Sequence, residues 1–103
     1  MTPAEMTHRL RHLHVEGDEI VARFTETTPE AVEALRQVKP AILILHQAAE
    51  QARCAEPLHV LVHEFRYDLE QMTAGAWPVE TVAEAIRIIG PGYGWTFNRE
   101  HAA

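Results

Sequence analysis

The sequence contains no serine, and it has a single cysteine (Cys54) and a single lysine (Lys39) among its 103 residues. The absence of serine excludes hydrolases that use a serine nucleophile. One cysteine cannot form an intramolecular disulfide, which is typical of proteins that fold in the reducing cytoplasm. The longest strongly apolar run, residues 41–45, is far shorter than the roughly 20 residues that span a bilayer. No basic-then-apolar signal segment opens the chain, so we expect a cytoplasmic protein that does not insert into a membrane.

Basic residues are few, with nine Lys and Arg against 15 Asp and Glu and a formal net charge of −6. Nucleic-acid binders need a basic surface that displaces counterions, so we expect no direct nucleic-acid partner. The length predicts a single domain over residues 1–103, because a chain this short cannot divide its apolar residues between two cores.

A β-hairpin is predicted within residues 12–24, where the apolar pattern has a period of two. Gly17-Asp18 is a two-residue turn signal with glycine first, which is typical of a type II′ turn. This turn places four apolar residues on one face: Leu13, Val15, Ile20 and Ala22. The opposite face carries His12, His14, Val21 and Arg23. A slip of one residue would send the apolar set to solvent, so the register is well specified.

Capping signals predict where the first helices begin. Thr2-Pro3-Ala4-Glu5 combines a cap, a proline at the first helical position and a capping-box glutamate. Thr28-Pro29-Glu30 begins a second helix, which Pro40 interrupts because proline lacks the N–H that a continuing helix would donate. A further helix then ends near Arg53.

The second half of the chain predicts two amphipathic helices and a strand. Apolar residues recur at helical spacing from Leu58 to Met72, with Gly75 as the stop, and again from Val79 to Ile89, with Gly90-Pro91 closing the segment. After this point Tyr93, Trp95 and Phe97 alternate with smaller residues, which predicts a short strand. One interpretation is that this strand pairs with the hairpin, covers one sheet edge and packs Trp95 or its neighbours into the core. The other is that the tail or the open edge receives a strand or an aromatic anchor of another protein.

Together these elements predict an α+β fold with a short helix, a β-hairpin, a C-terminal strand as a candidate third member of the sheet, and about four further helices. Residues 1–53 form an αββαα-like part, and residues 54–103 form a helical extension.

Residues 10–45 resemble the N-terminal docking domains of the TubC type, which occur at the ends of some nonribosomal peptide synthetase and polyketide subunits. The resemblance rests on these residues in this order: Leu13, Val15, Gly17-Asp18, Ile20, Thr28-Pro29-Glu30, Leu35, Lys39-Pro40, Ile42-Leu43 and Leu45. It implies the αββαα fold and the docking of a short partner segment against the hairpin, often in a homodimer. It does not extend to residues 54–103.

The sequence predicts a non-enzymatic protein-binding module whose partner is another protein, with a homodimer as a further expectation. The predicted contact residues are His12, His14, Val21 and Arg23, with Trp95 from the aromatic tail. Val21 suggests this face, because it is an apolar residue among polar neighbours.

Motifs of catalysis and cofactor binding are missing from the sequence. Gly90-Pro91-Gly92-Tyr93-Gly94 has the glycines of a phosphate loop but lacks the Lys-Ser/Thr ending. There is no His-Glu-x-x-His, and Cys54 has no base at a recognisable spacing. We expect neither an enzyme nor a cofactor.

Seven histidines nevertheless raise the question of a metal site. His12 and His14 lie two apart on a strand, and His59 and His63 lie four apart on a helix, so either pair could offer two nitrogens to zinc. A third ligand at a motif spacing is missing. We interpret both pairs as solvent-face residues and expect no metal.

An alternative function follows from the acidity. Small acidic chains also resemble phage or mobile-element inhibitors of the anti-CRISPR kind, which occupy the basic surface of a nucleic-acid enzyme complex. The residues that would carry this function are Glu64, Asp68, Glu70, Glu80 and Glu84. Salt would weaken such binding steeply, whereas it would weaken strand docking little.

Overall fold

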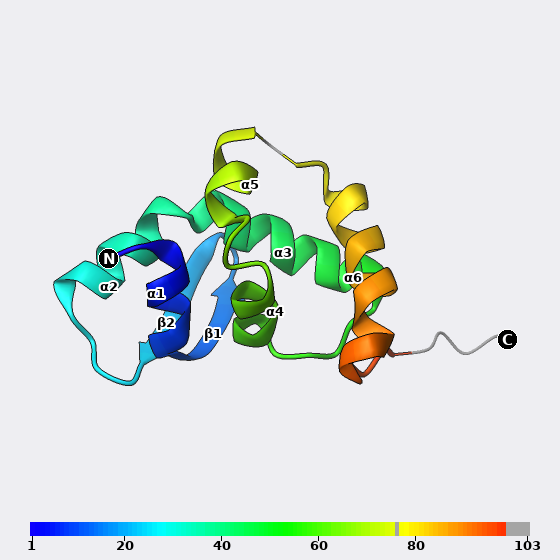
Figure 1. Ribbon diagram of the computed structural model, residues 1–103, viewed down its shortest axis with the longest axis horizontal. Helices are drawn as coiled ribbons and strands as arrows, with labels where there is room; N and C mark the ends of the chain where they lie inside the picture. The colour runs from blue at the N-terminus through cyan, green and yellow to red at the C-terminus, as the bar shows by residue number, and fades with distance from the viewer. Residues whose placement is uncertain (76, 99–103) are drawn as a thin grey trace, which may run out of the picture.

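A computed structural model describes residues 1–75 and 77–98 of the chain, and Figure 1 shows the arrangement of its elements. This part is an α+β fold that begins with the predicted αββαα order. The elements are α1 (Pro3–Arg9), β1 (Leu10–Glu16), β2 (Glu19–Phe24), α2 (Pro29–Gln37), α3 (Lys39–Ala52), α4 (Leu58–Glu64), α5 (Leu69–Gly75) and α6 (Val79–Tyr93). None of the helices in these residues is long and apolar enough to cross a membrane.

The hairpin has the predicted register, with Leu13 opposite Ala22 and Val15 opposite Ile20. Gly17 has a φ of +67° and Asp18 does not have a positive φ, as a type II′ turn requires. A β-bulge interrupts the pairing between Leu10 and His12. Because the bulge inserts one residue, Leu10 and Leu13 both face the core although they are three residues apart.

The predicted helix starts are confirmed. The Thr2 hydroxyl accepts a hydrogen bond from the Glu5 N–H at 3.1 Å, and the Thr2 N–H donates to the Glu5 carboxylate at 3.0 Å. The Thr28 hydroxyl likewise accepts from the Ala31 N–H at 3.2 Å. The interruption near Pro40 falls at Val38, a buried residue between the end of α2 and the start of α3.

The apolar segment after Leu58 is two helices rather than the one that was predicted. Helix α4 ends before Phe65 and α5 begins at Leu69, with a turn between them. The Arg66 guanidinium donates to the His63 carbonyl at 2.9 Å, which satisfies one of the last carbonyls of α4. Phe65 and Leu69 are buried in spite of the break. The periodicity therefore identified the buried residues but not the continuity of the backbone.

The expectation of a C-terminal strand that joins the hairpin is wrong. Helix α6 continues past Gly90-Pro91 and ends at Gly94, which has a φ of +74°. Within the described residues the sheet has two strands, and Phe97 instead forms an isolated antiparallel bridge with Cys54. The lack of a side chain at Gly90 explains this path, because Trp95 and Phe97 fold back into the space that a Cβ would fill.

Helix α3 lies at the centre of the molecule and packs against α4, α5 and α6 (Figure 1). Helix α4 also packs against β1 and against α1. The buried residues of the helices and of one face of the hairpin form a continuous hydrophobic cluster. This packing leaves the other face of the hairpin outside the core.

We predict opposite effects for alanine at two glycines of α6. Gly90→Ala should lower the free energy of unfolding by about 1–3 kcal/mol, because its Cβ would lie 2.5 Å from the Phe97 ring. Gly92→Ala is the matched control: its Cβ meets nothing within 4 Å, and it should raise stability by up to about 1 kcal/mol. Urea denaturation measures both. Equal stability of Gly90→Ala and the native protein would show that the tail does not fold back onto α6.

Candidate functional site

The outer face of the hairpin, defined by His12, His14, Val21 and Arg23, carries most of the predicted contact residues. His12 is paired with Arg23 across the strands, and His14 is paired with Val21, so the four side chains share this face. Val21 is 40% exposed, a large fraction for an apolar residue in a strand.

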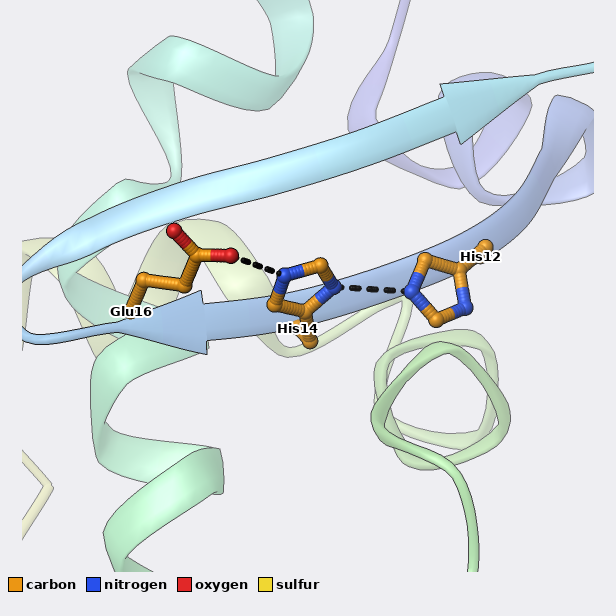
Figure 2. Close-up of polar contacts among 3 residues, drawn as sticks. All are labelled: His12, His14 and Glu16. Carbon is orange, nitrogen blue, oxygen red and sulfur yellow. Dashed lines mark hydrogen bonds and ion pairs between the residues drawn. The ribbon is translucent and has the colours of Figure 1, made fainter.

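Three side chains on β1 form a hydrogen-bonded row along this face (Figure 2). His12 Nε2 lies 2.8 Å from His14 Nδ1, and His14 Nε2 lies 2.7 Å from Glu16 Oε2. A carboxylate can only accept, so His14 Nε2 donates and the Nδ1 of a neutral His14 accepts from His12. The row thus holds both imidazoles along the strand in one defined arrangement.

The two edges of the hairpin differ. Helix α4 packs along β1, whereas the principal contacts of β2 are with β1 alone. In an antiparallel pair with this turn, alternate residues direct their N–H and C=O groups away from the partner strand, and on β2 these include Ile20 and Ala22. Their N–H groups have no backbone partner among the described residues. Strand β2 therefore presents an unpaired edge.

Positive charge gathers at the open end of the hairpin. Arg9 ends α1, Arg11 lies at the bulge, and Arg23 faces outward from β2. None of the three forms an ion pair with any residue in the described part of the chain. In a protein of net charge −6, this end carries three arginines against the exposed Glu26 that follows β2.

A cavity of about 390 Å³ lies on the other side of β1, between the strand and α4. The end of α1, the bulge, α4 and the end of α6 all contribute to it. Its lining residues are Thr7, His8, Leu10, Arg11, His59, Val60, His63, Glu64, Tyr93 and Trp95.

Helix α4 forms one wall of this cavity, and its side chains contact residues on two different sides of it. His59 and His63, one turn apart, face α1 and β1: His63 Nδ1 lies 3.3 Å from the Thr7 hydroxyl, and the His63 ring packs edge-on against His8 at 4.8 Å. Glu64 faces the other way and accepts a hydrogen bond from the Tyr93 hydroxyl at 2.7 Å. The expectation that His59 and His63 lie on a solvent face is wrong, since both are half-buried.

Burial lowers the pKa of both cavity histidines. The charges of His12 and Arg11 lower the pKa of His59 further. For His63, burial acts first and the charges of Arg66 and His8 add to it, while Glu64 acts in the opposite direction on its pKa. The neutral imidazole is thus favoured at both positions.

Neither predicted histidine pair is completed to a metal site. No group of three or more His, Cys, Asp or Glu side chains in residues 1–75 and 77–98 is placed to hold a metal ion. Burial also raises the pKa of the Cys54 thiol, which keeps that group in its unreactive protonated form.

Trp95, the predicted contact residue of the aromatic tail, lies apart from the outer face of the hairpin. It lines the cavity instead, and its ring stacks on Tyr93 at 5.3 Å with an angle of 21° between the planes. The reason is the fold-back of the tail onto α6, which directs the aromatic residues toward α4.

The acidic residues of the alternative function are divided among several elements. Glu64 lines the cavity and is engaged by Tyr93, Asp68 lies in the turn after α4, and Glu70 lies on α5. Glu80 and Glu84 share one exposed face of α6, where Glu84 pairs with Arg87 at 3.1 Å. The structure thus places only two of the five on one face of one helix.

Comparison with protein-family models, with curated proteins and with solved structures found no match for this chain. A function for this protein therefore has to be argued from its own surfaces and side chains.

Sequence reasoning identified the outer face but missed the cavity. The spacing of His59 and His63 was visible, yet spacing alone does not say which element covers a helix face. The lining residues come from three separate stretches of the chain, 7–11, 59–64 and 93–95, so no local pattern could have grouped them.

We predict that the cavity histidines make the protein less stable in acid. Their pKa is lower in the folded state, so the unfolded chain binds protons more readily and stability falls as the pH drops below about 6.5, the ordinary value for histidine. The urea midpoint should fall between pH 7.5 and 5.0. The double variant His59→Gln/His63→Gln should reduce this slope, and Arg36→Gln, which leaves every imidazole in place, should retain it. An unchanged slope in the double variant would contradict the prediction.

Proposed function

We propose that this protein is a docking module that binds an extended, acidic segment of a partner polypeptide along the outer edge of β2. The observation that carries the proposal is the unpaired edge of β2 next to Val21 and Arg23. The proposed role is binding without catalysis, and it agrees with what the resemblance to TubC-type docking domains implies.

The edge of β2 carries the charges of Glu19 and Arg23 but lacks the other features that usually protect an edge strand. Natural edges are blunted by lysine, by proline, by a bulge or by a covering helix. The segment Glu19–Phe24 contains neither lysine nor proline, the bulge lies on β1, and α4 covers the β1 side. The open backbone groups of β2 are therefore suited to β-strand addition, in which main-chain hydrogen bonds supply affinity.

The side chains next to this edge indicate the chemistry of the partner. An added strand would place alternate side chains beside Val21 and Arg23 on the outer face. An apolar residue would cover Val21, and an acidic residue would pair with Arg23, which forms no ion pair with the described residues. The surrounding arginines would also speed association with an acidic segment.

A displayed library of random 12-residue peptides, selected on the immobilised full chain, tests this proposal. We expect enrichment of acidic peptides with β-branched residues. Ala22→Pro should weaken binding of the enriched peptides at least about tenfold, because proline removes an outward N–H and leaves the β1–β2 ladder intact. Ala22→Val keeps that N–H and is the matched control. Fluorescence polarisation measures the affinities.

Side-chain recognition is tested separately. Replacing Val21 and Arg23 together, by Thr and Glu, should abolish peptide binding and leave the thermal midpoint nearly unchanged, because both side chains are exposed. Amide exchange of Ile20 and Ala22 should be fast in the free protein and slow in the complex.

Three outcomes would overturn the proposal. The first is the absence of enrichment, or binding that Ala22→Pro does not weaken. The second is a dimer of the chain, seen in sedimentation equilibrium and dissolved by Ala22→Pro, which would assign the edge to a second copy. The third is enrichment of basic peptides that Glu80→Lys/Glu84→Lys releases, which would favour the acidic inhibitor of the anti-CRISPR kind.

A further inference from the structure

The cavity between β1 and α4 plays no part in peptide docking at β2, because β1 separates the two. We infer that this cavity is a binding site for a small aromatic carboxylate, with its anionic group toward Arg11 and the histidines of α4 and its ring against Trp95. The inference is independent of the docking function.

The lining has one basic side and one aromatic side. The basic side consists of Arg11 at the bulge with His8, His59 and His63. The aromatic side consists of the stacked Tyr93 and Trp95 rings together with Val60 and Glu64. Glu64 is the carboxylate among the lining residues, and its hydrogen bond from Tyr93 fixes the aromatic wall. A ligand with a negative end and a flat apolar body matches this division.

Arg11 is suited to be the principal anion contact. Its guanidinium forms no ion pair with the described residues, and a guanidinium can donate two parallel hydrogen bonds to one carboxylate. The bulge sets its direction: the extra residue turns Arg11 out of the alternation of the strand and toward the cavity.

The contacts of the two α4 histidines favour different tautomers of the neutral ring. The Thr7 hydroxyl donates to the Ala4 carbonyl at 2.8 Å, so toward His63 it can only accept, and His63 Nδ1 carries the proton. The Nε2 of His63 then carries a lone pair. It can take up a second proton when an anion binds in the cavity.

His59 has the opposite arrangement. Its Nδ1 is buried and makes no hydrogen bond within the described structure, whereas its Nε2 is not among the buried atoms. Burying a lone pair without a partner costs less than burying an unpaired N–H, so the neutral ring carries its proton on Nε2. His59 therefore offers a donor to an anion without changing its charge.

Size limits the ligand to one or two rings. A volume of about 390 Å³ lies near the lower end of the roughly 300–1,000 Å³ typical of ligand pockets.

The test uses five probes with the full chain: benzoate, indole-3-acetate, the neutral amide of each, and inorganic phosphate. We expect the two acids to shift the Trp95 indole and Leu10 methyl NMR signals saturably, with Kd below about 1 mM. The amides lack the negative charge and phosphate lacks the aromatic ring. Both should therefore bind at least about tenfold more weakly than the acids. Three results would overturn the inference. They are equal affinity for the acids and the amides, binding of phosphate alone, and no NMR shift at an acid concentration of 5 mM, roughly five times that Kd limit.

Two variants locate the site. Arg11→Gln should weaken the acids at least about tenfold through loss of the bidentate contact. Arg36→Gln removes an arginine from the surface of α2, away from the cavity, and should leave the affinity unchanged. A comparable loss of affinity in both variants would mean that only the net charge of the protein matters. That result would contradict the proposed site.

Proton uptake on ligand binding tests the role of His63, because a histidine with a purely structural role would not take up a proton when the acid binds. The groups around His63 are His8 on α1, His59 and Glu64 on α4, Arg66 after it, Arg11 on β1 and Tyr93 on α6. Binding of an acid at pH 7 should draw a proton onto His63 Nε2. Titration calorimetry in PIPES and in Tris, which differ in ionisation enthalpy, should give different heats for the native protein and equal heats for His63→Asn. Equal heats in both buffers for the native protein would contradict this role of His63.

Discussion

The packing of α4 along β1 is the contact on which the rest of the molecule depends. Leu61 and Val62 of α4 are fully buried, and Leu13 of β1 is 3% exposed. This contact covers one edge of a two-stranded sheet, so the hairpin has a single open edge rather than two. It also holds His59 and His63 against the strand, where their environment differs from that of an exposed histidine. The open edge and the cavity are thus two consequences of one helix position.

A second constraint joins the C-terminal part to this arrangement. Gly90 allows Trp95 and Phe97 to return across α6, and the Cys54–Phe97 bridge fixes the returning chain to the end of α3. Tyr93 then reaches Glu64 on α4. Without this return the aromatic wall would lose Trp95, which stacks on Tyr93 at the end of α6.

The sequence predicted those features that depend on local chemistry. Thr2, Thr28 and Gly17 predicted a capping box, a helix start and a turn, because each residue acts on the backbone within three or four positions. The hairpin register was predictable for the same reason, since the turn fixes which residues face each other. The tail was not predictable in this way: the alternation of Tyr93, Trp95 and Phe97 is compatible with a strand, and its true path depends on a distant partner, Cys54.

The site shows the same division between local and distant chemistry. Membership of the outer face followed from the turn, but the two-sided cavity depends on how α1, α4 and α6 meet. The bulge illustrates why. Nothing in Leu10–Leu13 marks an inserted residue except that two leucines lie three apart in a strand whose side chains should alternate, and this spacing is also that of a helix. Because of this ambiguity the sequence did not predict the bulge, and it did not show that Arg11 is directed away from the outer face.

Charge is distributed in a way that relates the two surfaces. Arg9, Arg11 and Arg23 lie at the open end of the hairpin, and five of the seven histidines lie on α1, β1 and α4 around it. Of the acidic residues, Glu70 lies on α5, and Glu80 and Glu84 lie on α6. A chain of net charge −6 repels acidic molecules as a whole, so an acidic ligand gains most where the basic residues are concentrated and unpaired. Both the outer face and the cavity border this end, and β1 contributes to each: His12 and His14 to the first, Arg11 to the second. One strand with one bulge therefore presents two imidazoles on the outer face and one guanidinium toward the cavity.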